Sequence, residues 1–534
     1  MRKFAILFVS FLLLLAYSCN KSSDDSGNGS PANPELSISR SAIPVGTSSG
    51  YTDTFTIKSN ISWTIAVSAG AGAWLSTDTV KGGPGTTIVK LKVLTDNTTS
   101  SQAATITVAP VGTTAIQPQA LTVSQKTYGL IWQYSLGGSA SDQAMSMIPS
   151  ADGGFVMTGL TTSNDGDVSG YHGGGDTWVC KTDATGKKTW QRTLGGSLMD
   201  AGWSVVASGD GGCVMAGYAE SYYDGDVVGN HGHTDAWVVK LNAGGDTVWQ
   251  SALGGSGDDQ VMNIIATTDG GYVVAGQTFS NDGDVSGNHG ASDLWIARLD
   301  TKGKKVWTKT FGGSDYDFYG LVAATADGGY LLTGSTNSTD GDAAGNHGSS
   351  DILVLKLDAN GNKVWTKIFG GTAGEAARAI LSTPDGGCAV AGFTSSNDGD
   401  VSGNHSSSTT DMWVLKLDNT GKKLWQTTLG GTKDDQAYAI TASPDGGYMV
   451  AGYSSSKDGD VTVNHGNSDI WVVKLSDNGK KLWQKALGSS GQDWGDYIFA
   501  TADGGFMVGG FASGNDGDVT GNHGDVDAWM AKIK

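Results

Sequence analysis

The stretch Asp435–Leu487 decides the fold, and it reads DQAYAITASPDGGYMVAGYSSSKDGDVTVNHGNSDIWVVKLSDNGKKLWQKAL. It contains four runs of mostly apolar and β-branched residues, at 437–443, 448–453, 470–475 and 481–487. An Asp-Gly-Gly segment separates the first two runs and an Asn-Gly-Lys segment separates the last two. Glycine adopts positive φ without steric cost, so both segments predict tight hairpin turns. The stretch therefore predicts a four-stranded antiparallel sheet.

The same pattern recurs through most of the chain. One tryptophan marks each copy, at spacings of 58 to 60 residues: Trp132, Trp190, Trp249, Trp307, Trp365, Trp425 and Trp483. A long repeat with four strand-like runs is typical of one blade of a β-propeller. Segment 130–136 matches the fourth strand of a blade, whereas the chain ends on a segment, 529–532, that matches the third. We therefore expect a seven-bladed β-propeller over 130–534, closed by the N-terminal strand 130–136, because closure removes free sheet edges.

Composition excludes several classes of protein. The 534 residues include 82 glycines but only three glutamates, so 53 − 3 = 50 of the acidic residues are aspartates. Asp and Gly favour turns over helix interiors, which excludes an extensive helical domain. The net charge of −19 argues against binding to nucleic acid, which needs basic patches. Cys180, Cys213 and Cys388 lie in strand-like runs and are expected to be buried rather than paired.

The N-terminus has the pattern of an export signal. A basic start precedes the apolar run Phe4–Leu15, which is too short to span a bilayer. Together with Cys19, this segment resembles a bacterial lipoprotein signal peptide (1–18) of the kind found in Bacteroidetes-type surface lipoproteins. The resemblance implies a lipid on Cys19 that anchors the protein in the outer membrane, exposed at the cell surface; ordinary secretion is the alternative. Residues 19–34, rich in Ser, Gly and Asn, are expected to form a flexible linker.

Residues 35–126 carry short runs of alternating apolar residues separated by Gly, Ser and Thr. Such a series of short strands predicts an antiparallel β-sandwich. The residues Ser59-Asn60 before Trp63, the pair Trp74-Leu75 and the runs 104–108 and 121–125 resemble a BACON domain. That family is Ig-like and is often attached to surface proteins that handle glycans, so the resemblance implies a glycan-, mucin- or spacer-type role. Trp63 and Trp74 are predicted to be core residues rather than sugar-binding platforms.

The repeat motifs also resemble a known family. The units follow W-x-x-x-x-G-G, D-G-G-x-x-x-x-G and G-x-x-D-x-W-V-x-K-L patterns, with Leu353 in the Trp position of the fourth unit. These patterns are similar to the seven-bladed propeller repeats of bacterial surface proteins (SBBP-like repeats), some of which carry an endoglucanase label. The expected fold class is therefore all-β, with an Ig-like β-sandwich followed by a seven-bladed β-propeller.

Every unit contains a loop of the form Asp-Gly-Asp-Val-Ser-Gly-Asn-His-Gly-x-x-Asp or a close variant, and all eight histidines lie in these loops. Seven copies argue against catalysis, and one histidine in most loops argues against zinc. One interpretation is structural, with Asx-turns and a His–Asp hydrogen bond that locks the blade. The other is Ca²⁺ binding, because the oxygens follow an EF-hand-type spacing. The best Ca²⁺ candidates are Asp165, Asp167, Ser169, Asp176, Asp282, Asp284, Ser286, Asp293, Asp516, Asp518, Thr520 and Asp527.

Departures from the repeat mark candidate binding residues. An acid recurs before the first strand of each unit and is expected to cap a loop: Asp142, Asp200, Asp259, Asp317, Glu375, Asp435 and Asp493. The residues one and three positions later differ between units, and alternation places both on one face of the strand. Their aromatic and polar mixture suits sugars, although packing between neighbouring blades is the alternative. The candidate ligand-binding residues are Trp203, Phe318, Arg378, Tyr438, Trp494 and Asp496.

These features predict a non-catalytic cell-surface lipoprotein, expected to be a monomer, that binds a glycan or a surface protein through the propeller rim. Two alternatives remain, a glycoside hydrolase of endoglucanase type and a structural scaffold or spacer. Glycoside hydrolysis commonly needs two carboxyl groups, one of them with a raised pKa. Almost every aspartate follows the repeat, and Glu375 and Asp496 are the two notable acids that depart from it.

Overall fold

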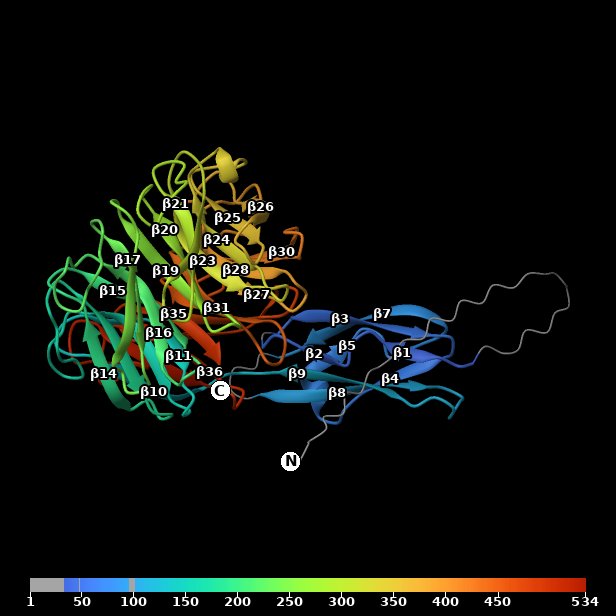
Figure 1. Cartoon of the computed structure of the whole chain (residues 1–534). Helices are drawn as coiled ribbons and strands as arrows, with labels where there is room; N and C mark the ends of the chain where they lie inside the picture. Colours follow the sequence, from blue (N-terminus) through green and yellow to red (C-terminus); the bar gives the residue numbers. More distant parts are fainter. Residues whose placement is uncertain (1–32, 48, 96–100) are drawn as a thin grey trace, which may run out of the picture.

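The computed structural model describes residues 33–47, 49–95 and 101–534. Regular structure in these residues is β-sheet, apart from two single-turn 3-10 helices, η1 (Ala71–Ala73) and η2 (Gly341–Ala343). Within the same residues, no helix is long and apolar enough to cross a membrane. The predicted signal peptide, Cys19 and all of the predicted linker except residues 33 and 34 lie outside the described residues. Figure 1 shows a ring of sheets joined to a smaller N-terminal domain.

The N-terminal domain consists of two sheets that share one core. The first sheet has the order β1-β3-β7-β5 and the second the order β2-β9-β8-β4-β6. Trp63 and Trp74 are both buried in the core between them, so they are core residues as predicted. The strands are β1 (Leu36–Ile38), β2 (Ala42–Pro44), β3 (Thr52–Ser59), β4 (Trp63–Val67), β5 (Leu75–Thr77), β6 (Lys81–Gly82), β7 (Gly85–Val93), β8 (Gln102–Pro110) and β9 (Gln119–Gln125).

The repeat region forms seven four-stranded antiparallel sheets, which we call blades one to seven in chain order. The strands of blades one to three are β11 (Asp142–Pro149), β12 (Phe155–Thr161), β13 (Asp176–Thr182), β14 (Lys188–Leu194), β15 (Asp200–Ala207), β16 (Cys213–Ala219), β17 (Asp235–Leu241), β18 (Thr247–Leu253), β19 (Asp259–Ala266), β20 (Tyr272–Thr278), β21 (Asp293–Leu299) and β22 (Lys305–Phe311). Those of blades four to six are β23 (Asp317–Ala324), β24 (Tyr330–Thr336), β25 (Asp351–Leu357), β26 (Lys363–Phe369), β27 (Glu375–Ser382), β28 (Cys388–Thr394), β29 (Asp411–Leu417), β30 (Lys423–Leu429), β31 (Asp435–Ala442), β32 (Tyr448–Ser454), β33 (Asp469–Leu475) and β34 (Lys481–Leu487).

Blade seven combines the two ends of the repeat region. It contains β35 (Asp493–Ala500), β36 (Phe506–Ala512), β37 (Asp527–Ile533) and, as its fourth strand, β10 (Leu130–Leu136). β10 runs antiparallel to β37, with Gln133 opposite Ala531. The first strands of consecutive blades pack side by side, and β11 also packs against β35. The arrangement is therefore a closed, propeller-like ring with the first strands on the inside (Figure 1).

Each blade is built around its third strand. That strand carries an almost fully buried tryptophan in six of the blades: Trp178, Trp237, Trp295, Trp413, Trp471 and Trp529. In five of them the indole N–H donates to a glutamine on the fourth strand, which keeps a buried polar group paired. In blade seven that glutamine is Gln133 of β10, 2.7 Å from the Trp529 nitrogen, so the closing strand makes the same bond as an ordinary fourth strand. The three cysteines of the described residues lie in blades one, two and five, where they are buried, as predicted, and form no disulfide.

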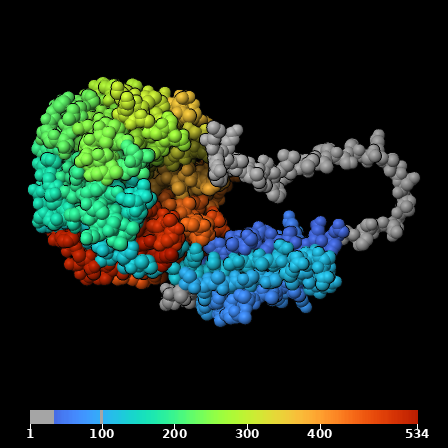
Figure 2. Space-filling model, turned by 60° about the horizontal axis from the view of Figure 1, so that its bottom comes forward, coloured from blue at the N-terminus to red at the C-terminus, as the bar shows by residue number. Residues whose placement is uncertain are grey.

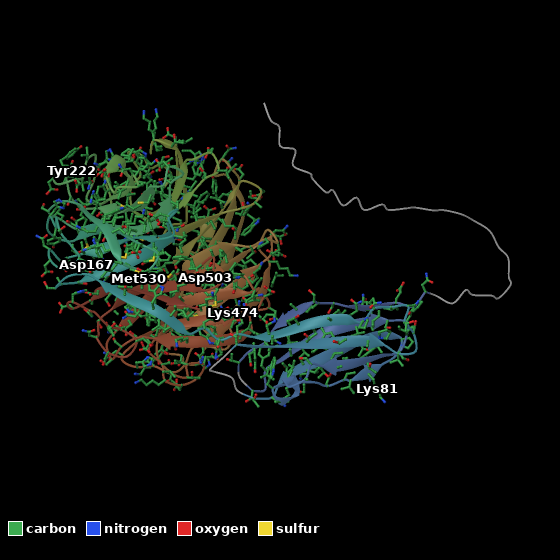
Figure 3. All side chains as sticks on the ribbon, turned by 90° about the horizontal axis from the view of Figure 1, so that it is seen from below. Lys81, Asp167, Tyr222, Lys474, Asp503 and Met530 are labelled. Atoms are coloured by element: carbon green, nitrogen blue, oxygen red, sulfur yellow. The ribbon has the colours of Figure 1, made fainter. Side chains whose placement is uncertain are left out.

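The N-terminal domain contacts the ring at the hairpin turns of blade six. Thr47 donates its backbone N–H to the Leu482 carbonyl at 2.8 Å, and the Lys126 ammonium lies 3.0 Å from Asp445. Tyr128 packs against Trp483 in an edge-to-face contact with ring centroids 5.1 Å apart. Figure 2 shows the domain against the C-terminal blades, and Figure 3 shows Lys474 of blade six close to it and Lys81 at its far end. The domain therefore lies on the face of the ring that carries the Asp-Gly-Gly turns.

Candidate functional site

The opposite face of the ring is held together by the recurring acids. In every blade the acid that begins the first strand is fully buried and accepts a backbone N–H from the loop before it, at 2.6 to 2.8 Å. Glu375 follows this rule, since its Oε2 accepts from Gly371 and its Oε1 accepts from Thr394. Burial raises the pKa of Asp317, Asp435 and Asp493 to about 6. These acids are loop caps, as predicted, and Glu375 is one of them.

The loop histidine of each blade forms a hydrogen bond with the acid that begins the third strand. The Nδ1 atom of the loop histidine lies 2.5 to 2.8 Å from the carboxylate that begins that strand in all seven blades. The histidine backbone N–H donates to the same oxygen, as His172 does to Asp176 at 2.8 Å. Burial raises the pKa of Asp176, and the hydrogen bonds from His172 oppose that rise. These contacts match the structural interpretation of the loop.

The structure gives the proposed Ca²⁺ ligands other partners within their own blades. In blade three, Asp282 Oδ1 accepts the Ser256 N–H at 2.7 Å, and Asp284 forms an ion pair with Lys305 at 2.5 Å. Asp293 holds His289, and the Ser286 carbonyl accepts a hydroxyl from the fourth strand. The equivalent pairs in blades one and seven are Asp165–Ser139, Asp167–Lys188, Asp176–His172, Ser169–Thr193, Asp516–Ser490, Thr520–Ser135 and Asp527–His523. Asp518 takes part through its backbone N–H, which donates to the Gly488 carbonyl, and among the described residues it has no lysine partner like that of Asp284.

No group of three or more His, Cys, Asp or Glu side chains is placed to hold a metal ion in the part of the chain that the structure describes. Ca²⁺ prefers six to eight oxygen ligands that converge on one point. Binding in the loops of blades one and three would therefore require the Lys–Asp and His–Asp pairs to separate, and binding in blade seven would require the His523–Asp527 pair to separate. Ca²⁺ binding stays a prediction, with most of its candidate ligands in other contacts.

A different set of residues converges at the centre of the ring. The first strand of every blade has a register shift against the second strand, which is a β-bulge. A bulge interrupts the alternation of a strand and redirects one side chain. Here it directs one residue per blade into the central channel, and we call these seven residues the channel ring: Met145, Trp203, Met262, Tyr319, Arg378, Tyr438 and Asp496.

Blade four departs from the other six. The position three residues after its leading acid is Gly320, and the side chain in the channel comes instead from Tyr319, with φ of 65°. A Cβ atom on Gly320 would lie 2.2 Å from the Gly276 carbonyl oxygen of the neighbouring blade. Only glycine fits at that contact, so the tyrosine occupies the preceding position in a left-handed conformation that a non-glycine residue seldom adopts. Tyr319 was therefore not among the residues predicted to bind ligand. The pair Tyr319-Gly320 is the sequence feature that could have indicated its position in the channel.

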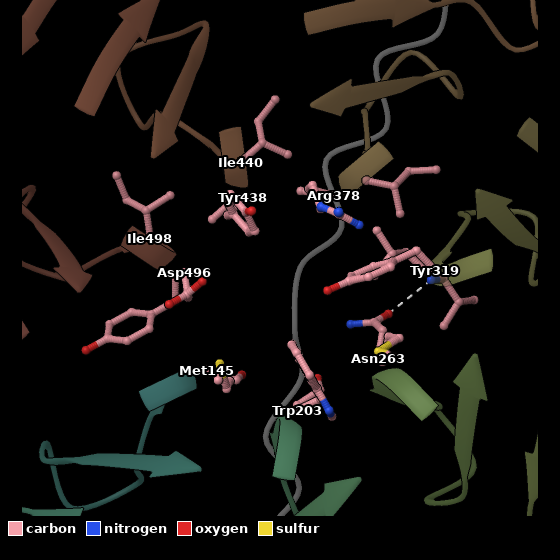
Figure 4. A pocket seen from close by; sticks show the side chains of 18 residues that line it. Met145, Trp203, Asn263, Tyr319, Arg378, Tyr438, Ile440, Asp496 and Ile498 are labelled. Carbon is pink, nitrogen blue, oxygen red and sulfur yellow. Dashed lines mark hydrogen bonds between the residues drawn. The ribbon is translucent and has the colours of Figure 1, made fainter. Parts of the chain in front are cut away.

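The channel ring surrounds a cavity of about 230 Å³. Its wall is completed by residues one and two positions further along the first strands, among them Ser146, Ser204 and Asn263. Figure 4 shows Trp203, Tyr319, Arg378, Tyr438, Asp496 and Met145 around the opening, with the Asn263 amide on the same wall. Asn263 Oδ1 accepts the Val322 N–H at 3.0 Å. The cavity thus combines aromatic faces with a few polar groups, a composition typical of small-molecule sites.

Two charged residues of the channel ring lack ordinary partners. The Nε and Nη1 atoms of Arg378 are buried and have no hydrogen-bond acceptor among the described residues. The guanidinium instead lies over aromatic rings, 3.7 Å from the Tyr319 centroid, 5.3 Å from Phe393 and 5.7 Å from Tyr438. Asp496 Oδ2 is likewise buried without a donor in the described part of the chain, and burial raises the pKa of Asp496 to about 7.

Four of the six residues predicted to bind ligand therefore meet in the cavity: Trp203, Arg378, Tyr438 and Asp496. Phe318 and Trp494 do not line it. Trp494 stacks on Tyr453 of blade six, with ring centroids 4.5 Å apart and planes inclined by 12°. The prediction assumed strict alternation, which put positions one and three after the acid on a common face. The bulge falls on the second of these positions and turns it away from the first, so Trp494 packs between blades, as the alternative interpretation had it.

Comparisons with known proteins give little beyond the fold. No family model matches the chain. The regulatory protein FlaEY of Caulobacter vibrioides is 27% identical over 243 residues, which is 43% of this chain and 25% of that protein, so the chain spans only a quarter of this relative's length. The WD40 domain of Neurospora crassa Pan2 is 12% identical, with 75% of this chain and 95% of that one covered and a TM-score of 0.41. Sqt1 of Chaetomium thermophilum is 9% identical, with 75% and 99% covered and a TM-score of 0.39.

Proposed function

We propose that this chain is a non-catalytic surface lipoprotein that binds a glycan in the central cavity of its ring. In this proposal the ring is a seven-bladed β-propeller, and the N-terminal domain is an Ig-like β-sandwich of BACON type that spaces the propeller from the membrane. The proposed binding site differs from the rim position expected from sequence, because the side chains at the bulged positions line the central cavity.

The observation that carries the proposal is the chemical variety of the channel ring. The residues that hold each blade together recur, since the loop histidine is present in all seven blades and the capping acid is aspartate in six blades and glutamate in one. The seven channel positions hold two methionines, three aromatic residues, one arginine and one aspartate. Aromatic faces such as Trp203 accept the apolar C–H faces of a sugar, and Arg378 and Asp496 offer polar groups to its hydroxyls.

The carboxyl groups favour binding over hydrolysis. Glycoside hydrolysis commonly uses two carboxyl groups about 5–10 Å apart on either side of the bond that is cleaved. Asp496 is the single acid among the residues that line the cavity. Glu375, the other acid singled out from sequence, is fully buried and its carboxylate oxygens accept hydrogen bonds from its own blade. We therefore place hydrolysis second, as the alternative that the experiment below includes.

A glycan array probed with the mature chain tests the proposal, with released reducing sugar assayed on the same glycans. Trp203→Ala should weaken binding of any hit by about 1–3 kcal/mol, the range for an aromatic anchor. Tyr222→Ala is the matched control, because Tyr222 is 56% exposed and lies outside the cavity. If Trp203→Ala and Tyr222→Ala both bound as tightly as the wild type, the cavity would not be the binding site. Failure of every glycan to bind would favour the scaffold role, and sugar release would favour the hydrolase.

Membrane anchoring is tested separately. In cells that express the full chain, Cys19→Ala should move the protein from the membrane fraction to the soluble fraction, because a lipidated cysteine is the proposed anchor. Ser18→Ala, which keeps the cysteine, serves as the control. A Cys19→Ala protein that stayed with the membranes would contradict the lipoprotein assignment without affecting the binding proposal.

A further inference from the structure

Arg378 is a cation that the fold places without a counter-ion. The bulge between Ala377 and Ala379 directs its side chain into the cavity. Buried cations of the ring have carboxylate partners, as Lys474 has Asp445 and Lys416 has Asp385. Arg378 has no ion pair with any described residue, and two of its nitrogens lack acceptors. Arg378 is half-buried, and two of its donors are out of contact with water without an acceptor, so a partner from outside the chain would offset that cost.

Stacking on Tyr319 uses the face of the Arg378 guanidinium, and two donors at its edge are left without acceptors among the described residues. Its guanidinium lies over the Tyr319 ring at 3.7 Å, which is a stacking contact that uses the face of a planar group. The N–H donors of arginine point outward in the plane of that group, and their fork matches the two oxygens of a carboxylate. Tyr319 itself holds an unusual backbone conformation, with φ of 65°, to supply this ring. The stacking contact therefore holds the guanidinium in an orientation that suits a planar anion.

Other parts of the cavity wall suit hydroxyl groups. Asp496 and the Asn263 amide lie on different sides of the cavity (Figure 4). Ser146 and Ser204 also line its wall. A carboxyl group with a pKa near 7 is partly neutral at neutral pH, so Asp496 can donate a hydrogen bond and repels an anion less than an ordinary aspartate would. Trp203 meets Tyr319 edge to face, with ring centroids 6.4 Å apart, and adds an apolar surface to the cavity wall.

We propose that the cavity selects an acidic sugar of monosaccharide size, with its carboxylate on the Arg378 guanidinium and its hydroxyls toward Asp496 and Asn263. This inference rests on the proposed glycan-binding function and adds the chemical class of the ligand. The cavity of about 230 Å³ is below the usual range for drug-sized ligands and fits one sugar ring rather than an extended chain.

Calorimetric titration of the mature chain with three probes tests the inference: D-glucuronate, D-glucuronamide and glucose 6-sulfate. The amide has nearly the same shape as glucuronate but no charge, and the sulfate carries a charge without the planar carboxylate. Glucuronate should bind at least about tenfold more tightly than either of the others, as expected for a charge-assisted bidentate contact. Arg378→Gln should reduce the preference over the amide to about one, and Arg378→Lys should restore part of it. Arg192→Gln, on the outer strand β14, is the matched control and should change nothing.

The outcomes separate this inference from the function on which it rests. Equal binding of glucuronate and glucuronamide would overturn the acidic class and leave glycan binding intact. Equal binding of glucose 6-sulfate would overturn the preference for a carboxylate. Binding of none of the three sugars, while the glycan array gives hits that Trp203→Ala abolishes, would overturn the acidic sugar alone; an array without hits would overturn both. Melting curves of the Arg378 variants establish that they are folded.

Discussion

The Arg378 guanidinium carbon lies 3.7 Å from the centroid of the Tyr319 ring, although the two residues belong to different blades. This contact joins blade five to blade four at the centre of the ring. A double-mutant cycle measures it without knowledge of any ligand. We expect Arg378→Met and Tyr319→Leu to show a coupling of about 0.5–2 kcal/mol in denaturant unfolding, the range of cation–π contacts. Arg378→Met combined with Trp249→Leu is the control and should be additive, because Trp249 packs against Tyr272 between blades two and three and shares no partner with Arg378. A coupling near zero for the first pair would contradict the stacking.

Two tryptophans on first strands should respond differently to truncation. Trp494→Ala removes a ring stacked at 4.5 Å on Tyr453 between blades six and seven, so we expect a loss of about 3–5 kcal/mol in unfolding free energy. Trp203→Ala removes a ring that lines the cavity, so its main effect should be on ligand affinity, with a smaller loss of stability. Denaturant melts of both variants measure the difference. A larger stability loss for Trp203→Ala would show that its role is packing.

The titration of Asp496 should make the free energy of unfolding depend on pH between pH 3.8 and about 7. Burial raises its pKa from 3.8 to about 7, so the folded state holds the proton more tightly than the unfolded state does. The stabilisation is fully present below pH 3.8 and is lost as the pH rises through about 7. Asp496→Asn removes the titration, so the wild type should lose on the order of 1–4 kcal/mol relative to the variant between pH 4 and 8. The exposed Asp315→Asn is the control. Parallel stability profiles for the wild type and Asp496→Asn would refute the raised pKa.

The closing strand should be indispensable to the ring. A chain that starts at residue 130 lacks the N-terminal domain but keeps β10, whereas one that starts at residue 137 lacks β10 as well. The second truncation exposes the edge of β37 and leaves the Trp529 indole without Gln133, so its melting temperature should fall well below that of the first. Equal melting temperatures would mean that β10 does not hold the ring closed.

Calcium offers a test of the repeated loops. The Lys305–Asp284 and His289–Asp293 pairs already satisfy the carboxylates of the blade three loop, so we expect EDTA and added Ca²⁺ to leave the melting temperature unchanged. A ligand that binds only the native state would raise stability by RT ln(1 + [L]/Kd). A Ca²⁺-dependent rise that Asp284→Asn abolished would instead support the Ca²⁺ prediction. Mg²⁺ serves as the control ion.

Local patterns in the sequence were enough to predict the sheets. The Asp-Gly-Gly turns, the alternation within each run and the matched ends at 130–136 and 529–532 all depend on neighbouring residues, and the strands follow them. The capping role of the acid that begins each blade was also predictable, because it depends on spacing within one unit. These features are local, and repetition in seven copies makes each of them visible to sequence reasoning.

The cavity was decided by tertiary structure. A β-bulge is a mismatch between two paired strands, so it is visible only in their register, and it separates Asp496 from Trp494 although both were predicted to share a face. Tyr319 lies in the channel because Gly320 must approach the Gly276 carbonyl of another blade, which no pattern within one unit records. The unpaired state of Arg378 likewise depends on six other blades that supply no carboxylate to it. The sequence by itself determined the blades and their order, whereas the contacts between blades decided which side chains meet at the centre.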